Sequence, residues 1–305
     1  TLLASSAASD VYKRQMYHSW NLRKLLRYIA FDMALVLAAI LLTRAGRQHF
    51  AAVDSAGGVS LPVLMYHSIA PVPETQYCIS PETLESDLQY LQEHHYTAVS
   101  PEELIAYTEG TGDLPEKPVL LTFDDGLYNN LSLALPLLEK YDMCAVISVV
   151  GSFADVYAPD APHNDIYSYL TWEDMQQLED SGRITLGSHT YDMHENGTRR
   201  GCAKMEQETE EAYHEALYTD LSMLQTEFQE NLHIQPTVFA YPYGFVCPES
   251  KLVLEELGFQ ITLTCLEKPN FITRNPACLY GINRYNRFGN CSTAEIMRQI
   301  LPDEK

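Results

Sequence analysis

Polar residues of the types that perform catalysis follow four predicted strands, each at the point where the strand ends. They are His67 after residues 62–66, Asp124 and Asp125 after 117–123, His189 and His194 after 184–188, and Tyr241 and Tyr243 after 237–240. One carboxylate with two imidazoles is the ligand set of a catalytic metal ion that keeps open coordination positions. The second aspartate is then left over to act as a base.

Each of these signals has an ordinary structural explanation when it is taken alone. Asp124-Asp125-Gly126 has the composition of a turn, as does the stretch 241–244, and two histidines this close together are common on surfaces and in cores. Because positions i and i+5 lie about 140° apart around a helix, His189 and His194 cannot form a zinc motif on one helix face. A loop after a strand can still bring both rings to one ion.

The order of the predicted elements explains how the four clusters could meet. Strand-like apolar runs are predicted at residues 62–66, 97–99, 117–123, 144–150, 184–188, 237–240, 261–264 and 280–283. Helices are predicted at 81–94 with Ser80 as N-cap, and at 101–108, 130–141, 171–181, 204–231, 249–257 and 293–300. This alternation predicts a parallel sheet, and seven or eight strands favour a barrel. The carboxyl ends of parallel barrel strands open onto one face, where active sites lie.

Composition excludes some classes of partner. The 305 residues include 20 Lys and Arg against 41 Asp and Glu, a formal net charge of −21. Such a surface repels phosphate backbones, so we do not expect a nucleic acid partner. The seven cysteines are irregularly spaced and form no C-x-x-C pair, which argues against a disulfide framework and against a cysteine zinc site.

The N-terminal segment has the order of an export signal. Residues 1–15 precede the first methionine without any pattern, and we expect them to be a non-native leader. Residues 16–47 place Arg23, Lys24 and Arg27 before an apolar run over 29–42, which predicts a signal peptide or a signal-anchor; a buried core helix is the alternative. Small and glycine residues over 48–60 predict a linker, leaving 61–305 as the main domain.

In combination, the motifs resemble those of the polysaccharide deacetylases, the NodB-homology family also called carbohydrate esterase family four. Leu121–Gly126 resembles the first family motif, Ser188–His194 the second and Tyr241–Gly244 the third. The i, i+5 histidine spacing and the early Leu64–Ser68 resemble the branch that deacetylates poly-β-1,6-N-acetylglucosamine in biofilms. The resemblance covers residues 61–287, most of the expected domain.

The resemblance implies a distorted (β/α)7 barrel that removes acetyl groups from an N-acetylated polysaccharide outside the cytoplasm. It implies that Asp125, His189 and His194 hold a divalent metal, zinc or another first-row ion. Asp124 would be the base that takes a proton from the attacking water, and His67 the acid that protonates the departing amine. The backbone N–H of Tyr243 would stabilise the oxyanion, and the Tyr241 and Tyr243 rings could stack on sugar.

One departure from the family pattern concerns the residue that orients the base. The third motif usually begins with an arginine, whereas this chain has Ala240 there, and we expect Arg284 to substitute for it or to contact substrate.

Two other functions remain open, namely a peptidoglycan or chitin-oligomer deacetylase and a catalytically silent glycan-binding module. The presence of all five expected catalytic and ligand residues disfavours the silent module.

Overall fold

The structure is a computed structural model that describes residues 31–33, 36, 58–156 and 162–301. The chain divides into two units, residues 1–56 and 57–305. Almost all of the predicted leader, signal-anchor and linker lies outside the described residues, so these boundaries stay predictions. Within the part that is described, no helix has the length and apolarity needed to span a membrane.

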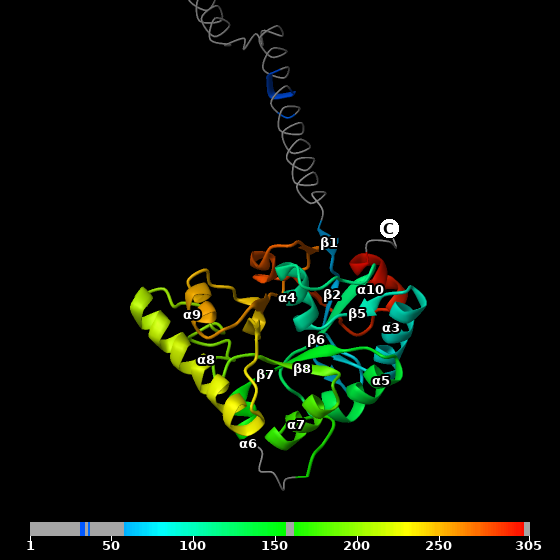
Figure 1. The fold of residues 1–305 in the computed structure, drawn as a ribbon, viewed down its shortest axis with the longest axis horizontal. Helices are drawn as coiled ribbons and strands as arrows, with labels where there is room; N and C mark the ends of the chain where they lie inside the picture. Colours follow the sequence, from blue (N-terminus) through cyan, green and yellow to red (C-terminus); the bar gives the residue numbers. More distant parts are fainter. Residues whose placement is uncertain (1–30, 34–35, 37–57, 157–161, 302–305) are drawn as a thin grey trace, which may run out of the picture. The chain divides into compact units, whose positions relative to one another are not determined.

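A curled parallel sheet forms the centre of the second unit (Figure 1). In spatial order its strands are β10 (Ile261–Leu263), β9 (Val238–Ala240), β8 (Ile184–Ser188), β7 (Ala145–Val149), β6 (Pro118–Phe123), β2 (Val63–Tyr66) and β12 (Tyr285–Asn286), and β5 (Thr97–Ala98) pairs with β6. Every neighbouring pair is parallel, which confirms the predicted α/β class.

The two edges of this sheet approach each other through a single bridge. Leu263 of β10 pairs with Ile282, a few residues before β12, so the curled sheet is a partial barrel rather than a regular closed one. Strands β6 and β7 are buried along their whole length because the sheet is covered on both faces. The carboxyl ends of β2, β6, β8 and β9 carry the predicted site.

Helices connect the strands and cover the sheet. They are α3 (Pro81–Glu93), α4 (Pro101–Glu109), α5 (Leu135–Lys140), α6 (Gly151–Val156), α7 (Trp172–Asp180), α8 (Glu210–Leu232), α9 (Ser250–Glu256) and α10 (Thr293–Ile300). Helix α3 packs with α5 and α10, and α8 packs with α7 and α9 (Figure 1). As predicted, Ser80 caps α3 by accepting a 3.1 Å hydrogen bond from the Thr83 backbone N–H.

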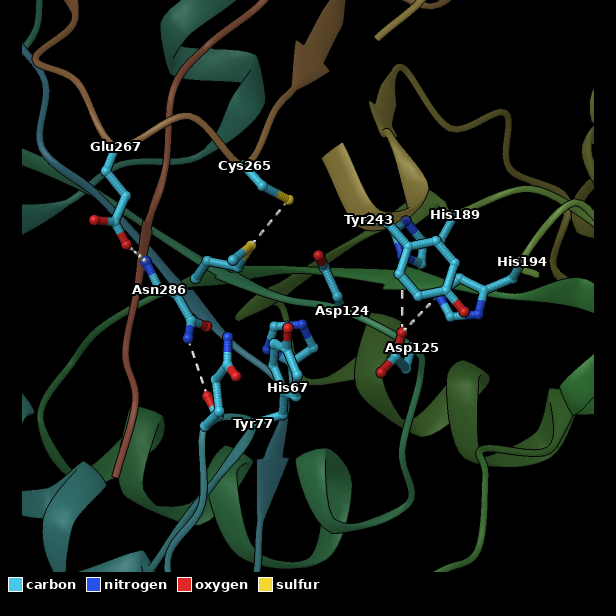
Figure 2. A pocket seen from close by; sticks show the side chains of 12 residues that line it. His67, Tyr77, Asp124, Asp125, His189, His194, Tyr243, Cys265, Glu267 and Asn286 are labelled. Carbon is cyan, nitrogen blue, oxygen red and sulfur yellow. Dashed lines mark hydrogen bonds and ion pairs between the residues drawn. The ribbon is translucent and has the colours of Figure 1, made fainter. Parts of the chain in front are cut away.

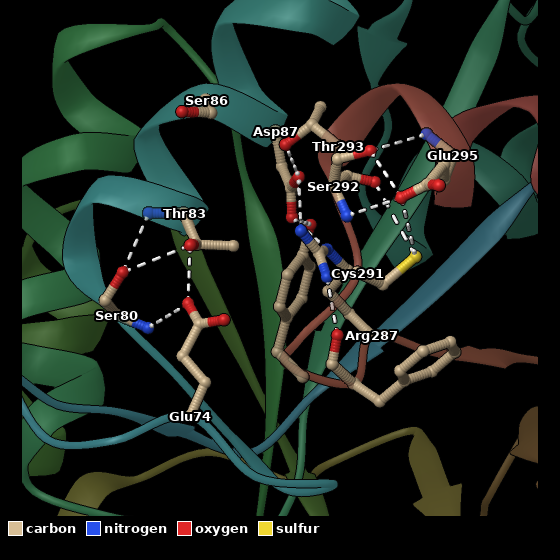
Figure 3. Close-up of polar contacts among 12 residues, drawn as sticks. Glu74, Ser80, Thr83, Ser86, Asp87, Arg287, Cys291, Ser292, Thr293 and Glu295 are labelled. Atoms are coloured by element: carbon tan, nitrogen blue, oxygen red, sulfur yellow. Dashed lines mark hydrogen bonds and ion pairs between the residues drawn. The ribbon is translucent and has the colours of Figure 1, made fainter.

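A buried ion pair ties α3 to the end of the sheet (Figure 3). Arg287 follows β12 and donates from Nε to Oδ2 of Asp87 in α3 over 2.7 Å. The same carboxylate accepts hydrogen bonds from Thr293 in α10 at 2.6 Å and from Tyr66 in β2 at 3.3 Å. Because both charged side chains are fully buried, this contact fixes the positions of three elements relative to one another.

Several predicted boundaries differ from the structure. The helix predicted at 204–231 begins at Glu210, because Thr209 caps it and the Glu208 carboxylate accepts the backbone N–H of Met205 in a preceding turn. The strand predicted at 280–283 is reduced to the Ile282 bridge, and β12 begins at Tyr285. Helix α6 was not predicted.

Short elements complete the fold outside the main sheet. Residues 59 and 60, predicted as linker, form strand β1 (Val59–Ser60), which pairs antiparallel with β11 (Phe271–Ile272). The first part of the helix predicted at 130–141 is a π-helix (Asn130–Ala134) before α5. Strands β3 (Ser68–Ile69) and β4 (Cys78–Ile79) form a small parallel pair, and two 3₁₀ turns occur at Pro242–Gly244 and Pro276–Leu279.

Candidate active site

The predicted clusters meet in one cavity of about 360 Å³ at the carboxyl ends of β2, β6, β8 and β9 (Figure 2). Its lining includes His67, Asp124, Asp125, His189, His194 and Tyr243. The remaining lining residues come from the ends of β2 and β10, from β12 and from the loop before β4; they are Met65, Gln76, Tyr77, Cys265, Glu267 and Asn286.

A turn directly after β6 lets two adjacent aspartates face the same cavity. Successive strand residues point to opposite faces, so the chain must turn for both to contribute. Asp125 and Gly126 both have positive φ values, 74° and 69°. A side chain at position 126 would also meet Val149, whose Cγ1 lies 2.9 Å from the Cβ position, so only glycine fits here. The backbone N–H of Asp124 donates to Tyr66, which joins this turn to β2.

Asp125, His189 and His194, here called the metal triad, converge as the ligands of one ion would. Asp125 Oδ1 lies 3.7 Å from Nε2 of His189 and 3.3 Å from Nε2 of His194. Their ligand atoms all lie within 4.8 Å of one another. Ligands bound about 2 Å from a zinc ion stand at comparable separations, so the three residues fit a first-row divalent metal.

The orientation of His189 is fixed by the backbone of the neighbouring strand. Its Nδ1–H donates to the carbonyl oxygen of Ala240 over 2.8 Å, and its side chain is almost fully buried. This bond sets the tautomer and leaves Nε2 directed at Asp125, which is the usual arrangement of a ligating histidine. Ala240, the position where the family motif has an arginine, therefore takes part through its backbone carbonyl group, which does not depend on the side chain.

Asp124 is held apart from the triad by Arg284. The guanidinium donates to both carboxylate oxygens, from Nη1 to Oδ1 at 2.7 Å and from Nη2 to Oδ2 at 2.8 Å. Asp124 is 2% exposed and Arg284 is 0% exposed. Burial alone would raise the pKa of Asp124, but the charges of Arg284 and His189 outweigh it and hold that pKa well below its usual range. Asp124 is therefore ionised at neutral pH.

Arg284 itself is fixed by three further contacts, one of them a 3.8 Å contact from Nη2 to the Cys265 sulfur. Its Nε donates to the backbone oxygen of Thr264 over 2.9 Å, and Nη1 also donates to the Thr122 hydroxyl at 3.2 Å. Because its donors are engaged and it is not among the cavity-lining residues, Arg284 lies in position to orient Asp124, whereas contact with substrate has no support from its location.

His67 directly follows β2 and lines the cavity together with Asp124 and Asp125. Its ring meets the ring of Tyr77 edge-on, with centroids 4.9 Å apart. The Asn130 side chain donates to the His67 backbone oxygen over 2.9 Å, which fixes the loop to the π-helix after the Asp-Asp-Gly turn. Burial lowers the pKa of the imidazole, and the carboxylates of Asp124 and Asp125 oppose this without reversing it.

The two tyrosines of the third motif lie in different environments. Tyr243 is 45% exposed and lines the cavity, with its ring stacked on His194 at a centroid distance of 4.8 Å. Tyr241 is 4% exposed, its hydroxyl is 2.8 Å from the Ser250 hydroxyl, and it does not line the cavity. Direct contact between Tyr241 and substrate therefore has no support from its position. The two tyrosines differ because the chain leaves β9 for a 3₁₀ turn, in which Tyr243 has a positive φ of 56°.

Several residues of the site carried no recognisable sequence signal. Asn130 lies in a predicted helix, and only the folded chain places it against His67. Tyr77, Glu267 and Asn286 come from loops and a short edge strand that follow no motif.

Comparison with known proteins gives one consistent family. A family model described as polysaccharide deacetylase matches residues 111–262, a range that contains the metal triad, Asp124 and Tyr243. YxkH of Bacillus subtilis (strain 168) is 29% identical over 229 residues, covering 73% of this chain and 70% of that protein.

Two further matches carry descriptions of deacetylation. The poly-β-1,6-N-acetyl-D-glucosamine N-deacetylase of Escherichia coli (strain K12) is 26% identical over 259 residues, which cover 78% of this chain and 38% of that enzyme. A structure of a de-N-acetylase from Aggregatibacter actinomycetemcomitans has a TM-score of 0.68 at 25% identity, covering 79% of this chain and 99% of that one. The chain thus spans well under half of the E. coli enzyme.

Proposed function

This chain belongs to the polysaccharide deacetylase family of hydrolases, and on that premise we propose that it releases acetate from N-acetylglucosamine units of a polysaccharide. The proposed substrate is a polymer of the poly-β-1,6-N-acetylglucosamine type found in biofilms. The proposed cofactor is a divalent first-row metal ion, zinc in the first instance, held by the metal triad.

One observation supports this proposal above the others. The cavity holds a separate ionised carboxylate, Asp124, and a separate imidazole, His67, beside a complete ligand triad. Hydrolysis of an amide needs a group that accepts a proton and another that donates one, because the water must lose a proton and the amine must gain one. A silent glycan-binding module would have no need of all three parts in one cavity.

Each residue has a distinct part in the proposed reaction. Asp124 accepts a proton from a water whose oxygen adds to the acetyl carbonyl carbon. His67 donates a proton to the nitrogen as the carbon–nitrogen bond breaks, so that acetate and a free amine leave. Asp125, His189 and His194 would hold the metal ion, which would supply Lewis-acid activation of the water and of the acetyl carbonyl group. The Tyr243 backbone N–H stabilises the developing oxyanion.

The low pKa of Asp124 has a consequence for this scheme. A carboxyl group with a lowered pKa is ionised at neutral pH and can accept a proton, but it is a weak base. Proton transfer to Asp124 therefore requires that the pKa of the attacking water is lowered as well. Arg284 keeps the carboxylate ionised and fixes its orientation by donating to both of its oxygens.

The proposed location follows the proposed substrate. Relatives of the chain are named as deacetylases of poly-β-1,6-N-acetyl-D-glucosamine. The basic-then-apolar order of residues 23–42 supports export through the N-terminal segment, retained as an anchor or removed as a signal peptide.

Acetate release tests the proposal directly. Purified protein would be incubated with N-acetylated β-1,6-linked and β-1,4-linked glucosamine oligomers and with peptidoglycan fragments, and free acetate measured. We expect the highest kcat/KM on the β-1,6-linked oligomer. Preference for another polymer would replace the proposed substrate, and absence of acetate from all of them, with metal bound, would refute the activity.

A further inference from the structure

A second cavity of about 390 Å³ adjoins the active site at the end away from the metal triad. The side chains of Gln76, Glu267 and Asn286 line both cavities and so form their common wall. Figure 2 shows Glu267 and Asn286 on the opposite side of the active-site cavity from His194. A polymer whose reacting unit lies at the triad can therefore place a neighbouring unit in the second cavity.

The lining of this second cavity has the chemistry of a sugar-binding subsite. Amide, hydroxyl and aromatic groups surround it, and they come from Thr75, Gln76, Asn286, Phe288 and Asn290. Amides and hydroxyls bond sugar hydroxyl groups, and an aromatic face packs against a sugar ring. Among its lining residues only Glu267 is charged, so any preference for a charged sugar unit would come from that carboxylate.

A different carboxylate, Glu74, lies beside the wall of the second cavity, and its oxygens already accept hydrogen bonds from the protein. Glu74 accepts hydrogen bonds from the Ser80 backbone at 3.1 Å, the Thr83 hydroxyl at 2.5 Å and the Asn290 backbone at 3.1 Å (Figure 3 shows the first two). Burial would raise the pKa of Glu74, but these bonds outweigh it and lower the pKa to about 2.

Close packing holds the segment 289–290 against the residues around Glu74. A Cβ atom at position 289 would lie 2.4 Å from the Glu74 Cβ atom and 2.9 Å from the Thr75 backbone oxygen, so only glycine fits there. Glu74 is therefore a structural residue of this loop, and it is satisfied without a ligand.

Unlike Glu74, Glu267 has a carboxylate with few hydrogen-bond partners in the protein. Its carboxylate accepts one long hydrogen bond, 3.4 Å from the Asn286 backbone N–H, and within the described residues it takes part in no ion pair. Its side chain is exposed at the cavity wall. A free carboxylate beside neutral hydrogen-bonding groups favours a cationic sugar over a neutral one.

Building on the proposed function, we propose that Glu267 binds the ammonium group of a glucosamine unit that has already been deacetylated, next to the unit that reacts. Deacetylation converts a neutral acetamide into an amine, which is a cation when it is protonated. The enzyme would then favour partly deacetylated chains over fully acetylated ones, so that successive deacetylations occur near one another along the polymer.

Binding measured without any reaction tests this inference. The probe is the fully deacetylated β-1,6-linked glucosamine tetrasaccharide, titrated by calorimetry at low ionic strength into wild type, Glu267→Gln and the control Glu116→Gln. Glu116 is exposed and lies outside both cavities, so the control matches the change in net charge. We expect Glu267→Gln to weaken binding about two- to fivefold, as for an exposed ion pair, and the control to leave it unchanged.

Two further comparisons use the same variants. The weakening should disappear at high salt, because screening removes the charge contribution. For acetate release, wild type should have a higher kcat/KM on a tetrasaccharide with one glucosamine unit than on the fully acetylated one, and Glu267→Gln should lose that preference.

The outcomes separate this inference from the proposed function. Equal binding of the cationic tetrasaccharide by wild type and Glu267→Gln at low salt would overturn the role of Glu267, even if acetate release proceeds normally. Equal weakening in Glu116→Gln would also overturn it, because only net charge would then matter. Failure of wild type to release acetate would refute the proposed activity, while the binding comparison would still decide the role of Glu267.

Discussion

Replacing Arg284 with methionine should destabilise the protein strongly and in a pH-dependent way. The side chain is fully buried and makes a two-bond contact with the buried Asp124 carboxylate. Methionine keeps much of the volume but leaves that carboxylate without its partner. Breaking a buried ion pair by removing one member costs about 3–5 kcal/mol, whereas replacing both members with neutral groups is often close to neutral.

The size of this loss can be compared with the whole stability of a domain, which is typically about 5–15 kcal/mol. We therefore expect Arg284→Met to lower the free energy of unfolding by about 3–5 kcal/mol while the protein still folds. The double variant Asp124→Asn with Arg284→Met should be more stable than Arg284→Met alone, because no unpaired charge is left in the interior. Urea unfolding followed by circular dichroism measures both.

The pH dependence of the loss has a definite sign. Burial raises the pKa of Asp124, but Arg284 and His189 lower it by more, so it is depressed in the folded protein. The resulting stabilisation is present above the unfolded carboxyl pKa of about 3.9 and is lost as the pH falls below it. The stability difference between wild type and Arg284→Met should therefore shrink as the pH is lowered from 6 toward 3.

Two results would refute this reasoning. A loss below about 1 kcal/mol in Arg284→Met, comparable to the exposed control Arg298→Met, would mean that the pair is not buried as described. A double variant no more stable than Arg284→Met would mean that the loss comes from packing and not from an unpaired charge.

Three further predictions concern the other parts of the structure. Replacing any one residue of the metal triad (Asp125→Asn, His189→Ala or His194→Ala) should lower the metal content found by elemental analysis without changing circular dichroism; unchanged metal in all three would remove the site. His67→Ala should abolish the limb of the pH–rate profile that falls with increasing pH. Burial lowers the His67 pKa, so in wild type that limb should begin on the acidic side of the ordinary histidine value; an identical profile in the variant would mean the amine takes its proton elsewhere. Asp87→Ala should cost about 3–5 kcal/mol in urea unfolding, because it leaves Arg287 buried and unpaired, and a much smaller loss would contradict that burial.

The sequence predicted the convergence of the site because the fold class determines where strand ends meet. His67, Asp124 and His189 follow three different strands, and parallel pairing brings those ends to one edge. The strands themselves were recognisable from continuous apolar runs bounded by turn residues. One helix start was recognisable because a capping residue precedes a proline, as at Ser80.

Contacts that depend on tertiary placement could not be read from local patterns. Arg284 was expected to take the place of the missing family arginine, but neither its two-bond geometry nor the fixing of His67 by Asn130 has a local sequence signal. Tyr241 is the converse case, since it belongs to a motif but its side chain is buried in the core beside Ser250. Glu267 likewise could be recognised as a cavity residue only from the fold, which places it beside Asn286, a residue that is near in space but distant in sequence.

Acetate release by Asp124→Asn at equal metal content is the most direct test of the central claim that Asp124 is the base and the metal triad a separate unit. Metal content would be measured on the same preparations of wild type and variant as the rate of acetate release. We predict that the metal content is unchanged and that kcat falls by roughly 10²–10⁴-fold, the usual contribution of a general base. Loss of metal together with activity, or a rate equal to that of wild type, would contradict the account.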